Sequence, residues 1–334
     1  MLTIRKLVFE VIIGLVILAA VMLACAMFGS QDISFADVFD ADTTDYQIFF
    51  KLRLPRVVLA GLVGAALAGC GVILQAILRN PLADPYILGV SSGAGLGVML
   101  AVITGIGYNF LAGSAVTVCA FVGALGTVWL VWIIGYFTSG TQTTSLLLAG
   151  VVVNAFFSAL IMFLTSIAQS HQVYSTIFWL MGNITEKPSP VLYSAGFLII
   201  AGIVLLFIVS QRLNLLAFGR KQAQSLGVNI TRVQFFAFAV SAFITAVAVS
   251  LSGLIGFVGL IVPHAVRLIV GPDHRRLLPL SAIAGAGFLV ISDTISRTIV
   301  APSQLPVGVI TAIAGGPFFL ILLARYSRKV SWYK

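Results

Sequence analysis

Charged side chains are what this sequence most lacks. Only 9% of its 334 residues are Asp, Glu, Lys or Arg, whereas soluble domains carry roughly 25%. Hydrophobic residues make up 60% of the chain, and the mean hydropathy is +1.12. A soluble core cannot enclose this much apolar surface, so lipid must be part of the solvent. The apolar runs are continuous and do not alternate with polar residues, which excludes a β-barrel and predicts an all-α integral membrane protein.

The few cysteines and the missing phosphate-binding motif argue against two kinds of chemical site. The three cysteines lie inside apolar runs without a C-x-x-C spacing, which is typical of small core residues: Cys25, Cys70 and Cys119. No G-x-x-x-x-G-K-[ST] loop occurs, so the chain has no phosphate-binding loop of that kind. The glycine repeats in "GCGVIL" and "GAGLG" stand within apolar runs, where they favour close packing of helices over a dinucleotide site.

Ten apolar segments are long enough to be predicted as spans, which form one transmembrane domain over residues 1–334. The first run follows Arg5 and Lys6 and is long for a signal peptide, so we expect it to be retained. The predicted spans are about 7–29, 57–78, 87–106, 112–138, 145–168, 190–210, 233–251, 254–271, 279–300 and 305–324.

The distribution of cations orients these spans. The net charge is +9, but the cations are scattered at span ends and do not form the cluster that a nucleic-acid site would need. With both termini in the cytoplasm, fourteen of the 19 cations lie inside and five lie outside, as the positive-inside rule requires. The five predicted outside are Lys51, Arg53, Arg56, Lys187 and Arg297.

One polar stretch interrupts the apolar chain after the sixth span. "LLAFGRKQAQSLGVNITR", residues 215–232, is basic and is placed in the cytoplasm. Gly219 and Gly227 are helix breaks, and the residues between them suggest one or two short helices on the membrane face. The pattern is equally typical of a solvated loop and of a docking element for a cytoplasmic partner.

Three longer stretches carry a family resemblance. They are "RLPRVVLAGLVGAALAGCGVILQAILRNPLADPYILGVSSGAGLG", "GLIGFVGLIVPHAVRLIVGPDHRRLLP" and "LPVGVITAIAGGPFF". Together they resemble the permease subunits of binding-protein-dependent ABC importers for iron chelates, haem and cobalamin, with the cobalamin-type permease as the closest pattern. The resemblance implies the type II importer permease fold of ten spans in the bacterial inner membrane. It implies a metal-chelate cargo without distinguishing ferric siderophore, haem and cobalamin.

The resemblance also implies partners. A second permease copy, identical or similar, would complete the pathway, two cytoplasmic ATPase subunits would bind below, and a periplasmic or lipid-anchored binding protein would dock above. ATP and Mg would bind to the ATPase, so we expect no cofactor, no metal site and no enzymatic activity in this subunit. A nucleic-acid partner is not expected.

Site residues follow from the same resemblance. The segment 213–231 matches the family's coupling helices, with Gly219, Arg220, Ala223, Leu226 and Gly227 as the contact residues. The outer arginines match positions that receive carboxylates of the binding protein; the alternative is that they only reach to lipid headgroups. These are Arg53, Arg56 and Arg297.

Three residues at the inner mouth of the fifth span or within it are assigned to the cargo pathway. Thr143 and Thr144 match the cytoplasmic gate, although a threonine before an apolar run is also a common helix N-cap. Asn154 lies about two turns into the same span, and it either faces the pathway or makes a hydrogen bond between helices.

The histidines and acids favour an importer over an ion-driven carrier. His264 and His274 belong to the shared motif and are expected to be structural, whereas His171, in a stretch expected to form a short helix near the external gate, is the one to examine if haem is the cargo. Asp293 stands four residues before Arg297, a spacing that permits an ion pair. A secondary transporter usually has an acid near the bilayer midplane, and Glu10, the one acid well inside an apolar run, lies near the cytoplasmic end.

Overall fold

The computed structural model describes residues 4–29, 31–34, 37–106, 112–139, 143–217 and 219–331. Throughout these ranges the secondary structure is helical, without strands. In chain order the elements are α1 (Ile4–Met27), η1 (Asp37–Phe39), α2 (Thr44–Tyr46), η2 (Gln47–Arg53), α3 (Leu54–Ile77), η3 (Pro85–Leu88), α4 (Val90–Ile103), α5 (Ala112–Ser139), α6 (Thr143–Ile167), α7 (Ser170–Leu180), α8 (Ser189–Ala217), α9 (Arg220–Ser225), α10 (Ile230–Ser252), α11 (Val258–Val270), α12 (His274–Thr298) and α13 (Val307–Ser331).

Ten of these helices are apolar enough to belong to a membrane domain. Seven are also long enough to cross a bilayer, and the described part of the chain adds three shorter ones in α4, α11 and α13. This agrees with the predicted architecture of about ten spans. The long helices leave apolar side chains on the outside, and α1 is exposed along most of its length while it packs on α12. Lipid is the environment that stabilises such faces.

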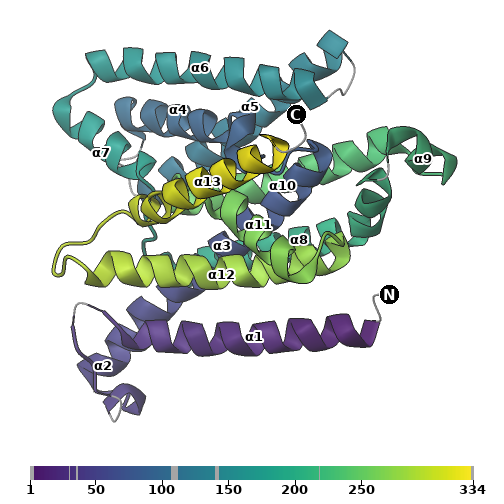
Figure 1. Ribbon diagram of the computed structural model, residues 1–334. Helices are drawn as coiled ribbons and strands as arrows, with labels where there is room; N and C mark the ends of the chain where they lie inside the picture. The colour runs from purple at the N-terminus through teal and green to yellow at the C-terminus, as the bar shows by residue number, and fades with distance from the viewer. Residues whose placement is uncertain are drawn as a thin grey trace.

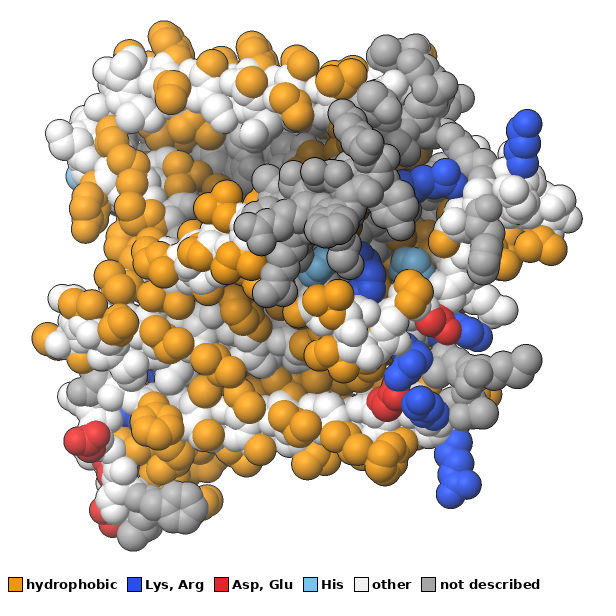
Figure 2. Space-filling model, in the orientation of Figure 1, with side chains coloured by type: hydrophobic (Ala, Val, Ile, Leu, Met, Phe, Trp, Pro, Cys, Tyr) orange, Lys and Arg blue, Asp and Glu red, His pale blue; other side chains and the backbone are white. Residues whose placement is uncertain are grey.

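Charge is distributed along the bundle as the predicted topology requires. In Figure 1 the N-terminus and α9 lie at the right-hand end, and α2 and α7 lie at the left-hand end. Figure 2 shows most visible Lys and Arg side chains at the right, with a broad hydrophobic band across the middle. The right-hand end is therefore the cytoplasmic side and the left-hand end the outer side.

The core is built around α3, which is buried along nearly its whole length. It packs against α12, α10, α11 and α8. A Cβ atom at Gly71 would overlap the carbonyl group of Gly259, and one at Gly64 would overlap that of Gly285. Only glycine permits these approaches. At Gly71 this confirms the prediction of close helix packing for "GCGVIL", whereas a Cβ atom at Gly69 would make only ordinary contacts.

Two interruptions of the helical bundle, the short helix η3 and the connection that precedes α11, meet in the interior. The helix α11 has 13 residues and so rises only about 20 Å, less than the roughly 30 Å of a bilayer core. Its preceding connection, residues 253–257, is bonded by Tyr86 of η3. The Tyr86 hydroxyl accepts from the Ile255 amide at 3.0 Å and donates to the Ile255 carbonyl at 3.1 Å. One side chain thus satisfies backbone groups that lipid could not.

Candidate functional site

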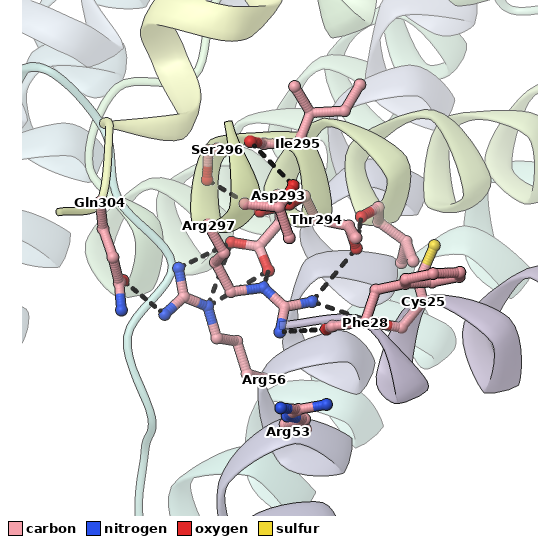
Figure 3. Close-up of polar contacts among 12 residues, drawn as sticks. Cys25, Phe28, Arg53, Arg56, Asp293, Thr294, Ile295, Ser296, Arg297 and Gln304 are labelled. Atoms are coloured by element: carbon pink, nitrogen blue, oxygen red, sulfur yellow. Dashed lines mark hydrogen bonds and ion pairs between the residues drawn. The ribbon is translucent and has the colours of Figure 1, made fainter. Parts of the chain in front are cut away.

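The outer end of the bundle contains a buried charge cluster centred on Asp293 of α12. Its side chain is fully buried. The Arg56 guanidinium donates to it from Nε at 3.1 and 3.2 Å and from Nη2 at 3.0 Å. Arg297 Nε lies 3.1 Å from Asp293 Oδ2, an ion pair one helical turn apart. This confirms the predicted Asp293–Arg297 pair, and Figure 3 shows the carboxylate lying between the two guanidinium groups.

The remaining donors of the cluster hold the end of α1. Arg53 Nη1 donates to the carbonyls of Ala26 at 3.3 Å and Met27 at 2.6 Å, and Nη2 donates to that of Gln31. Arg297 donates to the carbonyls of Cys25 at 3.3 Å and Phe28 at 3.4 Å. The last carbonyls of a helix lack partners within the helix and lie at its negative end, so cations stabilise them.

The three predicted docking arginines are therefore together, but they are turned into the protein. Arg53, Arg56 and Arg297 are 6%, 6% and 5% exposed, and Arg56 Nη1 also donates to Gln304 Oε1 at 2.9 Å. They line a cavity of about 150 Å³ that also includes the exposed Glu186. Three cations stand against two carboxylates, the buried Asp293 that Arg56 and Arg297 share and the exposed Glu186, so the cavity is positively charged on balance.

The cytoplasmic segment between α8 and α10, unlike the buried outer arginines, presents exposed side chains. It contains one short helix, α9, and not two, with left-handed backbone at Gly219 (φ +118°) and Gly227 (φ +81°) on either side. Ala223 is fully buried and anchors α9, and its carbonyl accepts from the Val228 amide at 3.0 Å. Lys221 and Leu226 are exposed. The side chain of Arg220 lies outside the described residues.

A polar network joins α8 to α12 at the same end. The Asn214 side chain donates to Asp273 Oδ1 at 2.7 Å and accepts from the His274 amide at 2.9 Å, while His274 Nδ1 lies 2.6 Å from Asn214 Oδ1. The bidentate contact with Arg275 lowers the pKa of Asp273 to about 2. His274 thus has the structural role that the sequence predicted.

Glu10, the acid of the first span, has a partner that the sequence did not indicate. Arg276 donates to its carboxylate at 2.9 Å from Nε and 2.5 Å from Nη2. The pair fixes α1 to the start of α12 at the cytoplasmic end. An acid that is paired with an arginine at the cytoplasmic end is not the midplane acid that an ion-driven carrier would use.

The other predicted residues are distributed over α6, α7 and α11. Thr143 and Thr144 begin α6, but their side chains lie outside the described residues. Asn154 is half-buried on α6. His171 is exposed on the short helix α7, and His264 on α11 packs edge-on against Phe318 with ring centroids 6.4 Å apart. Over the described ranges, no group of three His, Cys, Asp or Glu side chains could hold a metal ion.

Several cluster members have no local sequence signal. Arg56 and Asp293 are 237 residues apart, and Arg56 and Gln304 are 248 residues apart. Helical spacing could reveal only the Asp293–Arg297 pair. Two signs point to a shared site: the unusual presence of three arginines on the outer side and their match to family positions.

Comparison with known proteins identifies the class. Residues 16–325 match the FecCD transport family, and the chain belongs to this family. It is 40% identical over 300 residues to the hemin transport system permease protein HmuU of Yersinia pestis, covering 89% of this chain and 90% of that one. It is 42% identical over 285 residues to the cobalamin import system permease protein BtuC of Halobacterium salinarum, covering 85% and 75%.

Further similarities extend to another cargo and to a solved structure. The molybdate import system permease protein MolB of Haemophilus influenzae is 34% identical over 296 residues, covering 88% of this chain and 86% of that one. A metal-chelate type ABC transporter, solved in an inward-facing conformation, superposes with a TM-score of 0.85 at 31% identity, covering 96% of this chain and 99% of that one. The protein is thus a multi-pass membrane protein with the ABC permease fold.

Proposed function

We propose that this chain is the permease subunit of a bacterial inner-membrane importer that receives a metal chelate from an external binding protein. A separate ATPase drives the transport, and the chain itself makes and breaks no bonds. The observation that carries this proposal is the match over nearly the whole chain to permeases of one family. The relatives are named for hemin, cobalamin and molybdate, so overall similarity does not select a cargo.

ATPase docking is assigned to the segment around α9. Two exposed side chains support this assignment: Leu226, which is apolar and 63% exposed, and Lys221. Both belong to a segment that the buried Ala223 anchors. Gly219, Arg220 and Gly227 complete the contact, and ATP and Mg bind only to the ATPase. Leu226→Asp should abolish co-purification with the co-expressed ATPase. Phe39→Asp, an equally exposed apolar position on the outer side, is the matched control; equal loss in both variants, or in neither, would contradict this assignment.

The transport pathway is assigned to the interface between two copies. Thr143 and Thr144 form the cytoplasmic gate at the start of α6, and Asn154 lies along the path on the same helix. The large apolar side chains that α6 exposes would pack against the second copy. Thr143→Cys should form a disulfide-linked dimer in membranes under oxidation, whereas Ser189→Cys, at the outer start of α8, should not. A Thr143→Cys protein that stays monomeric would contradict the gate.

Binding-protein docking is assigned to the outer arginine cavity. Arg53, Arg56 and Arg297 supply a positive field that attracts the carboxylates of the binding protein, and Glu186 at the same cavity opposes it. Charge reversal of Arg56 or Arg297 is a poor test, because it would place a second carboxylate beside buried Asp293. Glu186→Gln should instead tighten docking up to about fivefold at low salt, since exposed charges contribute about 0–1 kcal/mol each. Asp42→Asn, on the same side but outside the cavity, should leave affinity unchanged; no gain for Glu186→Gln would count against the cavity as the docking site.

A further inference from the structure

A groove of about 580 Å³ lies at the cytoplasmic end of the bundle, between the end of α8 and the start of α10. Its lining combines two arginines, Arg212 and Arg232, with apolar side chains that include Ile208. Leu226 and Gly227 of the proposed ATPase contact also line it, but neither arginine belongs to that contact. The groove shares no lining residue with the outer arginine cavity.

The positive charge of this groove is not balanced by the described part of the chain. Arg212 and Arg232 are exposed, and within that part neither guanidinium group takes part in an ion pair or a hydrogen bond. None of the lining residues is acidic. Arg232 also lies in the first turn of α10, where the positive end of the helix dipole disfavours a cation. An anionic ligand would supply the missing negative charge.

The exposed apolar face of α8 ends at this groove. Ile200, Val204 and Ile208 are each more than half exposed. Arg212 continues the same four-residue spacing, so it lies on the same face of the helix. Ile208 precedes the end of α8 by nine residues, which is about 13 Å along the helix axis. The groove therefore extends from the cytoplasmic surface into the apolar layer of the membrane.

The start of α10 has the same arrangement. Phe235 and Phe236 are exposed and follow Arg232 by three and four residues, which places them on one side of the helix. Both arginines thus stand at the cytoplasmic end of an apolar face of the kind that lipid stabilises. Such a combination fits a phospholipid, because a guanidinium group binds phosphate through two parallel hydrogen bonds while the apolar face contacts an acyl chain.

We propose that this groove binds the phosphate of an anionic phospholipid from the cytoplasmic leaflet, with an acyl chain along the α8 face at Ile208. Basic pockets between membrane helices on the cytoplasmic side are a recurrent type of headgroup site. The lipid must be anionic, because the amine of a zwitterionic headgroup would add positive charge to a site that already has an excess. The inference rests on the sorting of cations and does not depend on the transport assignment.

Two other occupants fit the groove less well. An acidic segment of the ATPase would meet the arginines, but a soluble partner would not account for the depth to which the groove reaches at Ile208. A second copy seated groove to groove would bring four arginines together, because a two-fold contact repeats the same residues on both sides.

Native mass spectrometry of the delipidated full-length permease in detergent tests the proposal, with phosphatidylglycerol and phosphatidylcholine of the same acyl chains as probes. The parent should bind phosphatidylglycerol about tenfold or more tightly than phosphatidylcholine. Arg212→Gln and Arg232→Gln should each weaken phosphatidylglycerol binding about fivefold, the contribution expected of one cation beside anionic headgroups, and the double variant should lose the preference. Arg5→Gln, an exposed cytoplasmic arginine outside the groove, should bind as the parent does.

A second pair of variants separates a shaped groove from diffuse attraction by charge. Ile208→Trp would fill the groove without changing its charge, and we expect it to remove most of the preference for phosphatidylglycerol. Leu205→Trp, at an exposed position of α8 outside the groove, should retain the preference. Unchanged thermal unfolding of Ile208→Trp checks its fold.

Equal affinity of the parent for the two lipids would overturn the proposal, and so would parent-like binding by the double arginine variant. In the second case, loss of ATPase co-purification or of the dimer would assign the groove to that protein partner. A preference untouched by Ile208→Trp would also contradict it, because only the attraction common to all cytoplasmic cations would remain. Displacement of phosphatidylglycerol by an equal concentration of inorganic phosphate would instead indicate a site for free anions, against the lipid assignment.

Discussion

The two ends of this molecule use arginine in opposite ways. At the outer end Arg53, Arg56 and Arg297 are nearly fully buried, and their guanidinium groups contact a carboxylate, a glutamine or helix-end carbonyls. At the cytoplasmic end Arg212 and Arg232 are exposed, and the described residues give their side chains no acidic partner. The three outer arginines thus stabilise contacts among α1, α3 and α12. At the cytoplasmic end Arg275 and Arg276 are paired with Asp273 and Glu10, whereas Arg212 and Arg232 stay available to a partner or to lipid.

This contrast explains an exception to the positive-inside rule. The rule concerns cations that face water or headgroups on either side of the membrane. Two of the three outer arginines share a buried carboxylate, and the third binds carbonyls at the end of α1, so their charge is only partly compensated within the protein, but all three are held by protein groups. Breaking such an arrangement leaves uncompensated buried charge and is costly, whereas changing an exposed cation is not.

The largest effect should therefore come from Asp293. Asp293→Leu would leave Arg56 and Arg297 buried without their shared carboxylate, at a cost of about 3–5 kcal/mol. We expect a large drop in the thermal unfolding temperature of the purified permease, followed by intrinsic fluorescence. Asp42→Asn, on an exposed outer acid, is the control and should unfold like the parent. If the two variants were equally stable, the cluster would not hold the helices together.

Arg53 offers an intermediate test of the same end. Arg53→Gln would leave the carbonyls of Ala26 and Met27 without their donor, and we expect a loss of about 1–3 kcal/mol. Because this loosens the end of α1, the half-buried thiol of Cys25 should react faster with a maleimide. Lys51→Gln, an exposed cation two residues earlier, should not change the rate. An unchanged thiol reactivity in Arg53→Gln would show that these hydrogen bonds do not hold α1.

The sequence predicted what depends on short spacing and composition. Apolar runs indicated about ten membrane helices, the four-residue spacing indicated the Asp293–Arg297 pair, and glycines marked both sides of α9. It could not indicate contacts between distant segments, such as Arg56 with Asp293 or Glu10 with Arg276. Apolar composition also conceals breaks: the run after Gly253 reads as one span, but Phe257 has left-handed backbone (φ +69°) and α11 begins only after it.

At the cytoplasmic end, Gly227 allows the effect of backbone conformation to be tested apart from steric crowding. Nothing lies within 4 Å of a Cβ atom built there, yet its φ is +81°. Gly227→Val should therefore cost about 1–2 kcal/mol through backbone strain alone and weaken ATPase co-purification while the chain still inserts. Gly227→Asn tolerates left-handed backbone and should retain most of the association. Equal weakening by both would instead indicate that the ATPase packs directly against this position.

The smallest effect concerns the pH dependence of the cap at α12. The pKa of Asp273 lies at about 2, below its ordinary value of 3.8, so the ionised form is favoured in the folded state. Its contribution to stability is present above about pH 4 and is lost as the pH falls through 4 toward 2. The side chain is 28% exposed, and solvent screening should limit the contribution to below about 1 kcal/mol.

Between pH 5 and pH 3 the unfolding temperature of Asp273→Asn should fall less than that of the parent, because the variant has no carboxylate to protonate at this position. Asp37→Asn, at the exposed start of η1 on the outer side, controls for the general titration of acids. Parallel curves for the parent and Asp273→Asn would show that this cap contributes nothing measurable, and the stabilising charge contacts would then be confined to the buried pairs.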